Sequence, residues 1–102
     1  MPSIPAISVE DLPPGTVKEV LISGRTYAVC NTQGAYYAVS GDCPHRNGPL
    51  GHGAVHGYQL VCPWHLWEFD VRTGVSEFAP DCPIATYPVT VDTAGIVHIE
   101  LP

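Results

Sequence analysis

The sequence predicts a single all-β domain, and three observations carry that prediction. The chain has 102 residues, which is about the length of one domain with a modest core. Hydrophobic residues make up 45% of it and charged residues 14%, which argues against a disordered tail or a long-helix protein. Its 11 prolines and 10 glycines favour short strands joined by turns.

The N-terminal part of the chain is predicted to lead into a strand meander. Residues 1–16 carry four prolines and are expected to form an extended lead-in with little regular structure. Three apolar runs follow, over 17–22, 25–30 and 35–39, separated by Ser23-Gly24 and by residues 31–34. Short turn sequences between β-branched and aromatic runs predict antiparallel strands joined by hairpins.

A glycine-rich segment and a second set of short strands are predicted in the rest of the chain. Five glycines fall between positions 41 and 57, which predicts a loop-rich insert whose backbone approaches something closely. Short strands are expected over 58–61 and 66–69, followed by a turn over 70–74 and a strand over 75–78 that pairs back. The tail should form a hairpin of 84–91 and 96–101 with its turn at 92–95.

Charge and hydropathy exclude several functional classes. The net charge is −6, and the four basic side chains are scattered, whereas nucleic-acid binding needs clustered Lys and Arg. An acidic surface suits a basic protein partner, although ordinary solubility explains it equally well. No apolar stretch is long enough to cross a membrane and the N-terminus lacks a secretory signal, so a soluble cytoplasmic protein is expected.

Four cysteines in a chain without an export signal favour metal binding over disulfides. Cys30 ends an apolar run and is predicted to be a small buried hydrophobic residue. Cys82 falls in a predicted loop and receives no role. Among the histidines, His52 and His56 flank Gly-rich turns and are expected on the surface, and His98 is expected on the exposed face of a strand.

Two short motifs carry most of the functional information: Cys43-Pro44-His45 and Cys62-Pro63-Trp64-His65. Each offers one thiolate and one imidazole, and 16 residues, 46–61, separate them. Such a set suits either a closed tetrahedral zinc or a two-iron, two-sulfide cluster with two thiolates on one iron and two imidazoles on the other. Zinc fingers usually keep Cys with Cys and His with His, so the mixed halves favour the cluster, with a zinc-stapled interaction module as the alternative.

At these residues the sequence resembles the Rieske family of iron-sulfur proteins. The resemblance runs through residues 43–50 and 62–65, then through 67–70 and Thr73-Gly74. It implies an antiparallel β-sandwich or barrel scaffold of about 1–40 and 78–102, with a cluster-binding lobe of about 41–77 inserted in it. It also implies one Rieske-type 2Fe-2S cluster, with Cys43 and Cys62 on one iron and His45 and His65 on the other.

The resemblance further implies a centre in the low-potential branch of the family. High-potential relatives carry a Ser and a Tyr that donate hydrogen bonds, at the positions that Trp67 and Phe69 hold here. They also carry a disulfide at the positions of Gly48 and Trp64. Trp64 and Trp67 are instead expected to cover the cluster from water. One departure is Leu66, which stands where the family usually has Gly, so a different local backbone or a shield over His65 is expected.

The predicted function is that of an electron carrier and not of an enzyme. Four protein ligands leave no open metal position for a substrate, and the chain has no recognisable nucleophile or phosphate-binding motif. The resemblance implies transfer of one electron from a flavin-dependent reductase to the terminal component of an aromatic-ring hydroxylating oxygenase. The exposed edges of His45 and His65 would be the exit, within a docking rim formed by Arg46, Asn47, Gly48, Pro49 and Leu66. The small subunit of an NAD(P)H-dependent nitrite reductase is the alternative, since it shares the fold but often lacks the ligands.

Overall fold

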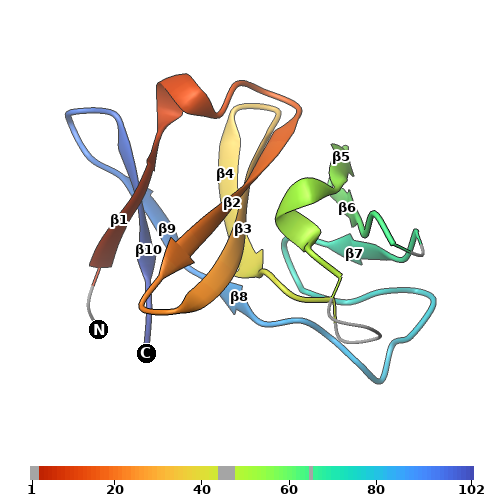
Figure 1. Ribbon diagram of the computed structural model, residues 1–102. Coiled ribbons are helices and arrows are strands. Elements are labelled where there is room, and N and C mark those ends of the chain that lie inside the picture. The colour runs from red at the N-terminus through yellow and green to blue at the C-terminus, as the bar shows by residue number, and fades with distance from the viewer. Residues whose placement is uncertain (1–2, 44–47, 65) are drawn as a thin grey trace.

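Three antiparallel sheets make up the computed structural model, which describes residues 3–43, 48–64 and 66–102. The first sheet has the order β1 (Ser3–Ser8), β10 (Ile96–Glu100), β9 (Val89–Val91). The second has the order β2 (Thr16–Ile22), β3 (Arg25–Thr32), β4 (Ala35–Ser40), β8 (Thr86–Tyr87). The third has the order β5 (Ala54–His56), β6 (Gln59–Val61), β7 (Glu68–Asp70). Figure 1 shows the first two sheets together as a scaffold and the third beside them.

The predicted meander is confirmed in β2, β3 and β4, which are joined by two-residue turns. The turn residues are Ser23-Gly24 and Gln33-Gly34, and all four have positive φ angles between 51° and 84°. Positive φ at both central positions is the type I′ geometry, whose twist matches that of the flanking strands. The turn chemistry therefore fixes the register of the scaffold's central sheet.

The prediction of an irregular lead-in over 1–16 is wrong for residues 3–8, which form β1. This strand pairs with β10 from Ser3 opposite Glu100 to Ser8 opposite Ile96. Pro5 is accommodated because β1 is the edge strand of its sheet, and the register shifts between Pro5 and Ile7. A single 3-10 turn, η1 (Val9–Asp11), follows it.

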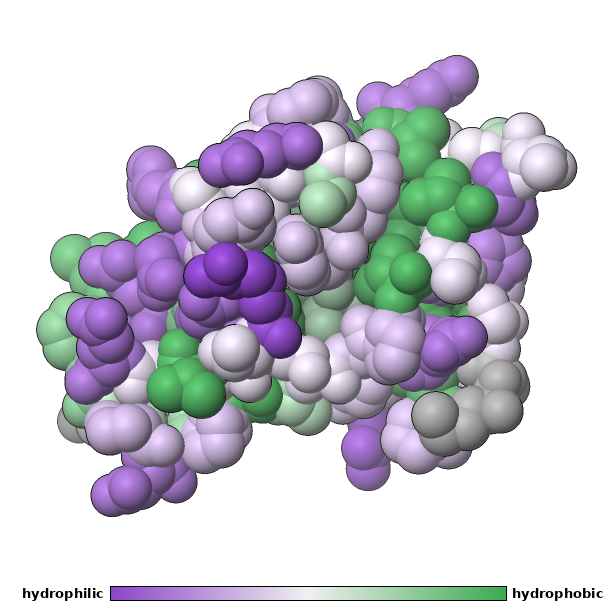
Figure 2. All heavy atoms as spheres, turned by 180° about the vertical axis from the view of Figure 1, so that it is seen from behind, coloured by the Kyte–Doolittle hydropathy of each residue, from purple (hydrophilic) through white to green (hydrophobic). Residues whose placement is uncertain are grey.

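The predicted strand over 84–91 is divided at Pro88 into β8 and β9, which belong to different sheets. β8 pairs with β4, whereas β9 pairs with β10. Pro88 has no N–H for a ladder, but its carbonyl accepts a hydrogen bond from the Glu100 N–H at 2.9 Å. The chain thus crosses between the two scaffold sheets at this residue, in keeping with the predicted sandwich or barrel. Seen from behind, hydrophobic residues form a band on the side where β9 and β10 lie (Figure 2).

The third sheet differs in detail from the prediction for residues 54–78. β5 lies inside the glycine-rich segment, where no strand was expected, and the strand predicted over 66–69 begins at Glu68. The strand predicted over 75–78 reduces to a bridge between Ser76 and Ala79, although the Asp70 N–H donates to the Val75 carbonyl at 2.9 Å. Strands of three residues are too short to show a clear alternation of apolar and polar residues, and the prolines and glycines near them predict loops.

Strand β3 is buried on both faces and joins two hydrophobic clusters. Tyr27 and Val29 point into the cluster between the two scaffold sheets, whereas Ala28 and Cys30 point into the cluster shared with the third sheet. The predicted burial of Cys30 is confirmed, and burial raises the pKa of its thiol to about 11. The core of residues 41–77 is therefore continuous with that of the scaffold.

Candidate metal centre

The first ligand-bearing loop rises from a stem held by backbone hydrogen bonds. The Leu50 N–H donates to the Gly41 carbonyl at 2.9 Å, and the Cys43 N–H donates to the Gly48 carbonyl at 2.9 Å. Cys43 is fully buried. His45, between the two ends of this loop, lies outside the described residues. The stem therefore fixes the position of one predicted thiolate ligand.

The second ligand-bearing loop connects β6 to β7 and is closed in the same way. The Cys62 N–H donates to the Trp67 carbonyl at 2.8 Å, and the Leu66 N–H donates to the Cys62 carbonyl at 3.0 Å. Cys62 is fully buried, and it belongs to the same hydrophobic cluster as Cys43. His65 lies outside the described residues.

The two loops meet at Gly48. A Cβ atom built on Gly48 would lie 2.7 Å from the Sγ of Cys62, a separation that side chains do not tolerate. The same Cβ would lie 3.5 Å from the Cβ of Trp64, which is within the range that a disulfide spans. The two positions that the resemblance associates with a disulfide therefore face each other, and here Gly and Trp occupy them. The structure thus brings the loops of Cys43 and Cys62 into contact, as the paired motifs predict.

Leu66 adopts the left-handed backbone conformation, with a φ of 61°. A glycine adopts this conformation without steric cost, which explains physically why that residue is usual at this position. The side chain is 68% exposed, so its burial does not offset the strain. Leu66 therefore has the backbone conformation that a glycine would adopt easily. The alternative expectation, that Leu66 shields His65, stays a prediction because His65 lies outside the described residues.

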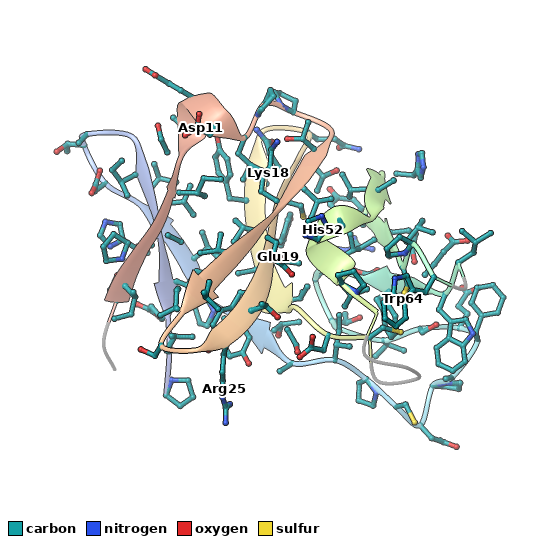
Figure 3. All side chains as sticks on the ribbon, in the orientation of Figure 1. Asp11, Lys18, Glu19, Arg25, His52 and Trp64 are labelled. Atoms are coloured by element: carbon teal, nitrogen blue, oxygen red, sulfur yellow. The ribbon has the colours of Figure 1, made fainter. Side chains whose placement is uncertain are left out.

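The first loop is fastened to the scaffold at both ends. At one end, the Gly41 N–H donates to the Thr26 carbonyl at 3.0 Å. At the other end, beyond the loop, a Cβ on Gly51 would lie 2.6 Å from the Cα of Glu19, so the chain packs directly on β2. The Nε2 of His52 lies 2.9 Å from the Oε2 of Glu19. His52 is exposed, as predicted, but sequence reasoning missed its contact with β2 because 33 positions separate the pair. The two labelled residues lie side by side in Figure 3.

Aromatic residues adjoin the second loop in different ways. Phe69 is fully buried, and its ring lies 6.4 Å from that of Trp67, which packs against the core. Trp64 is 62% exposed. Of the two tryptophans expected to cover the centre, Trp67 is the one packed into the fold.

The remaining candidate residues lie where the sequence predicts them. His98 is partly exposed and its Nε2 lies 2.8 Å from Asp92 Oδ2, while its neighbours Val97 and Ile99 are buried. Cys82 is exposed, and its N–H donates to the Ala79 carbonyl. Across residues 3–43, 48–64 and 66–102, no group of three His, Cys, Asp or Glu side chains suited to a metal ion is present, and the predicted ligands His45 and His65 lie outside these ranges. Within these ranges no helix is long and apolar enough to cross a membrane.

Comparisons with known proteins agree with this arrangement. The model of the Rieske 2Fe-2S domain matches residues 3–88. The ferredoxin component of the naphthalene 1,2-dioxygenase system of Pseudomonas putida is 32% identical over 95 residues, covering 92% of this chain and 91% of that protein. Sphingomonas yanoikuyae B1 ferredoxin has a TM-score of 0.89 at 31% identity, covering 99% of this chain and 100% of that one. A chain in the complex of reduced oxygenase and oxidized ferredoxin in carbazole 1,9a-dioxygenase has a TM-score of 0.85 at 27% identity, covering 95% of this chain and 100% of that one.

The chain belongs to the Rieske 2Fe-2S domain family. Its relatives are ferredoxins, which are electron-transfer components and not the catalytic components of their systems. The predicted all-β fold, the predicted class of electron-transfer protein and the prediction of one Rieske 2Fe-2S cluster are therefore confirmed. The comparisons thus favour the cluster over the alternative of a zinc-stapled interaction module. The small subunit of a NADH-dependent nitrite reductase from Mycobacterium tuberculosis also has a TM-score of 0.89, but at 20% identity this likeness shows the fold alone.

Gly48→Ala should lower the cluster content of the purified protein. The added methyl group meets Cys62 Sγ at 2.7 Å, and overpacking of this kind costs about 1–3 kcal/mol. Gly57→Ala is the control, because Gly57 has a φ of 59° but open space around its Cβ, so it adds backbone strain at the turn between β5 and β6 without a clash. Iron analysis and the visible spectrum measure the outcome. Equal iron content in both variants would contradict the role assigned to Gly48.

Leu66→Gly should stabilise the protein, because it removes a left-handed leucine that costs about 1 kcal/mol. For a domain of this size that gain raises the unfolding midpoint by about 4–8 °C. Leu66→Ala keeps a Cβ in the same conformation and should leave the midpoint close to that of the wild type. Thermal unfolding followed by circular dichroism checks both, and a lower midpoint for Leu66→Gly would show that the side chain contributes more than the strain costs.

Proposed function

We propose that this protein carries one electron at a time from a flavin-dependent reductase to the terminal component of an aromatic-ring hydroxylating oxygenase. The observation that carries the proposal is the contact between the two loops at Gly48 and Cys62. Cys43 and Cys62 are also buried in the same hydrophobic cluster of the core. Support also comes from the ferredoxin component of the naphthalene 1,2-dioxygenase system and from the complex of a ferredoxin with the oxygenase of carbazole 1,9a-dioxygenase.

The proposed ligands are the thiolates of Cys43 and Cys62 on one iron and the imidazoles of His45 and His65 on the other. The described residues fit this assignment, because soft thiolates suit iron-sulfur centres and the two loop stems hold the cysteines in adjoining positions. When bound, the cluster supplies a one-electron redox centre, and its histidine ligands give it a higher potential than four thiolates would. We further propose that residues 1–102 work as one domain, with the cluster-binding lobe at about 41–77.

The chain's own residues set the surroundings of this centre. Leu50, Leu60 and Phe69 are fully buried behind the cysteines and exclude water from that side. Phe69 has no hydrogen-bond donor to stabilise the reduced state, so we expect a potential at the low end of the Rieske range. A low potential suits a carrier that receives electrons from a flavin and delivers them to an oxygenase.

The proposed docking surface lies around the second loop. Trp64 and Leu66, which flank position 65, are 62% and 68% exposed, so two large apolar side chains border the predicted exit. The rim proposed from the sequence also includes Gly48 and Pro49, of which Gly48 is buried and Pro49 half-buried, and residues 46–47 outside the described ones. A net charge of −6 favours a partner with a basic surface, because opposite charges accelerate a transient encounter.

Reconstitution tests this function directly. We expect the purified brown protein to become paramagnetic on reduction and to restore NADH-dependent turnover to the purified reductase and oxygenase of the naphthalene 1,2-dioxygenase system. Cys62→Ala should lose the iron and all turnover, whereas Cys82→Ala, which removes an exposed thiol, should match the wild type. Electron delivery to a sirohaem nitrite reductase and to neither dioxygenase component would favour the alternative function.

Phe69→Tyr should raise the midpoint potential, because the new hydroxyl places a donor in the buried surroundings of the centre, where it stabilises the reduced state. The matched control is Phe78→Tyr, since Phe78 is the other phenylalanine of the chain and is 63% exposed. Protein-film voltammetry measures both variants. An unchanged or lowered potential for Phe69→Tyr, with iron content preserved, would count against the assigned role of Phe69.

A further inference from the structure

We propose that the scaffold binds a small carboxylate with an apolar group, such as an aryl carboxylate, in a hollow around Arg25. The hollow lies beside the turn between β2 and β3, and no step of the electron transfer described above uses it. Figure 3 shows Arg25 at the lower end of the scaffold, pointing away from the ribbon. The proposal does not depend on which proteins exchange electrons with the cluster.

Two adjoining hollows make up this site. One has a volume of about 360 Å³ and the other of about 380 Å³, and they share Arg25, Tyr27 and Tyr87. The apolar walls of the first are formed by Ile4, Ile22, Leu101 and Pro102. The second is more polar and includes Thr26, Ser40 and Asp42. An apolar wall beside a few convergent polar groups is the usual composition of a small-molecule site.

The Tyr27 hydroxyl is the first sign that an outside group belongs here. Tyr27 is 6% exposed, and its ring packs edge-on against Tyr87 with centroids 5.2 Å apart. Within the described part of the chain, no protein group forms a hydrogen bond with this hydroxyl. The residue is nearly buried yet lines the hollow, so its hydroxyl can donate a hydrogen bond to a group bound there.

The Arg25 guanidinium is the second sign. Arg72 forms an ion pair with Asp70, with 2.8 Å between Nη2 and Oδ2. Arg25, in contrast, forms no ion pair within the described ranges. Arg25 and Tyr87 line both hollows, so the guanidinium and the phenol border the same space. Asp42 lines the more polar hollow, and its negative charge repels an anion there. A bound anion is therefore expected on the other side of Arg25, in the apolar hollow.

These groups together define the ligand. A guanidinium binds a carboxylate through two parallel hydrogen bonds, and phenol hydroxyls can donate to the same oxygens. A single ring fits against the aliphatic wall in a hollow of about 360 Å³. The site therefore favours a molecule with both features over one that has the charge or the ring alone.

Phenylacetate is a suitable probe, titrated into the oxidised, cluster-loaded protein by calorimetry and by amide chemical-shift mapping. We expect saturable binding at one site that perturbs the amides of Arg25 and Tyr27. Arg25→Gln should weaken the affinity about tenfold or more, the usual effect of losing a hydrogen bond to a charged group. Lys18→Gln removes the same charge from neighbouring β2 and should leave the affinity unchanged. Tyr27→Phe should weaken it with the visible spectrum intact.

Matched ligands separate the two halves of the proposal. Phenylacetamide keeps the ring without the charge, and acetate keeps the charge without the ring, so both should bind about tenfold more weakly or worse. The proposal is overturned if the wild type shows no saturable binding of phenylacetate. It is also overturned if Arg25→Gln and Lys18→Gln behave alike, or if phenylacetamide binds as well as phenylacetate. None of these results depends on electron transfer, so each is distinguishable from a failure of the proposed function.

Discussion

The approach of Gly48 to Cys62 is the constraint on which the metal centre depends. Two loops from separate parts of the chain must place their cysteines together, and the space between them admits no side chain at position 48. Each stem is held by backbone hydrogen bonds, and the first is also fastened to β2 and β3. The scaffold thus holds in place the two loops that carry Cys43 and Cys62, the proposed thiolate ligands.

Strand β3 is buried on both faces and connects the two hydrophobic clusters, so the loops at the metal centre depend on the packing of the scaffold as well. Its alternate side chains enter the scaffold core and the core shared with the lobe. A substitution in this strand would thus be felt on both sides, since protein interiors transmit changes of volume. Cys30 illustrates the point, because its buried side chain packs in the hydrophobic cluster that β3 shares with the third sheet.

Much of this architecture is predictable from the sequence, and the failures have physical causes. The meander is predictable because Ser23-Gly24 and Gln33-Gly34 are typical turn sequences, and the paired Cys and His motifs indicate the cofactor. β1 is not predictable because Pro5 within it argues against pairing, and nothing local shows that β10 lies beside it. β5 was missed because three residues among glycines carry no periodicity.

The candidate site shows the same division between local and distant information. Loop membership of Cys43 and Cys62 follows from the sequence, whereas the closeness of Gly48 to Cys62 requires coordinates. Leu66 could be marked as unusual, but its positive φ could not be derived from its identity, since a leucine disfavours that conformation. The Arg25 hollow could not be predicted at all, because its lining comes from both ends of the chain.

The two tight hairpins of the central sheet also bear on how the protein acquires its cofactor. Their strands are close in sequence, so they can pair early in folding, whereas the ligand loops meet through contacts between distant residues. The β2–β3–β4 meander is thus expected to form while the two cysteine loops are still apart. Iron and sulfide would then bind while the loops of Cys43 and Cys62 have not yet met, beside strands that are already paired. Assembly of the cluster would be the last step of maturation.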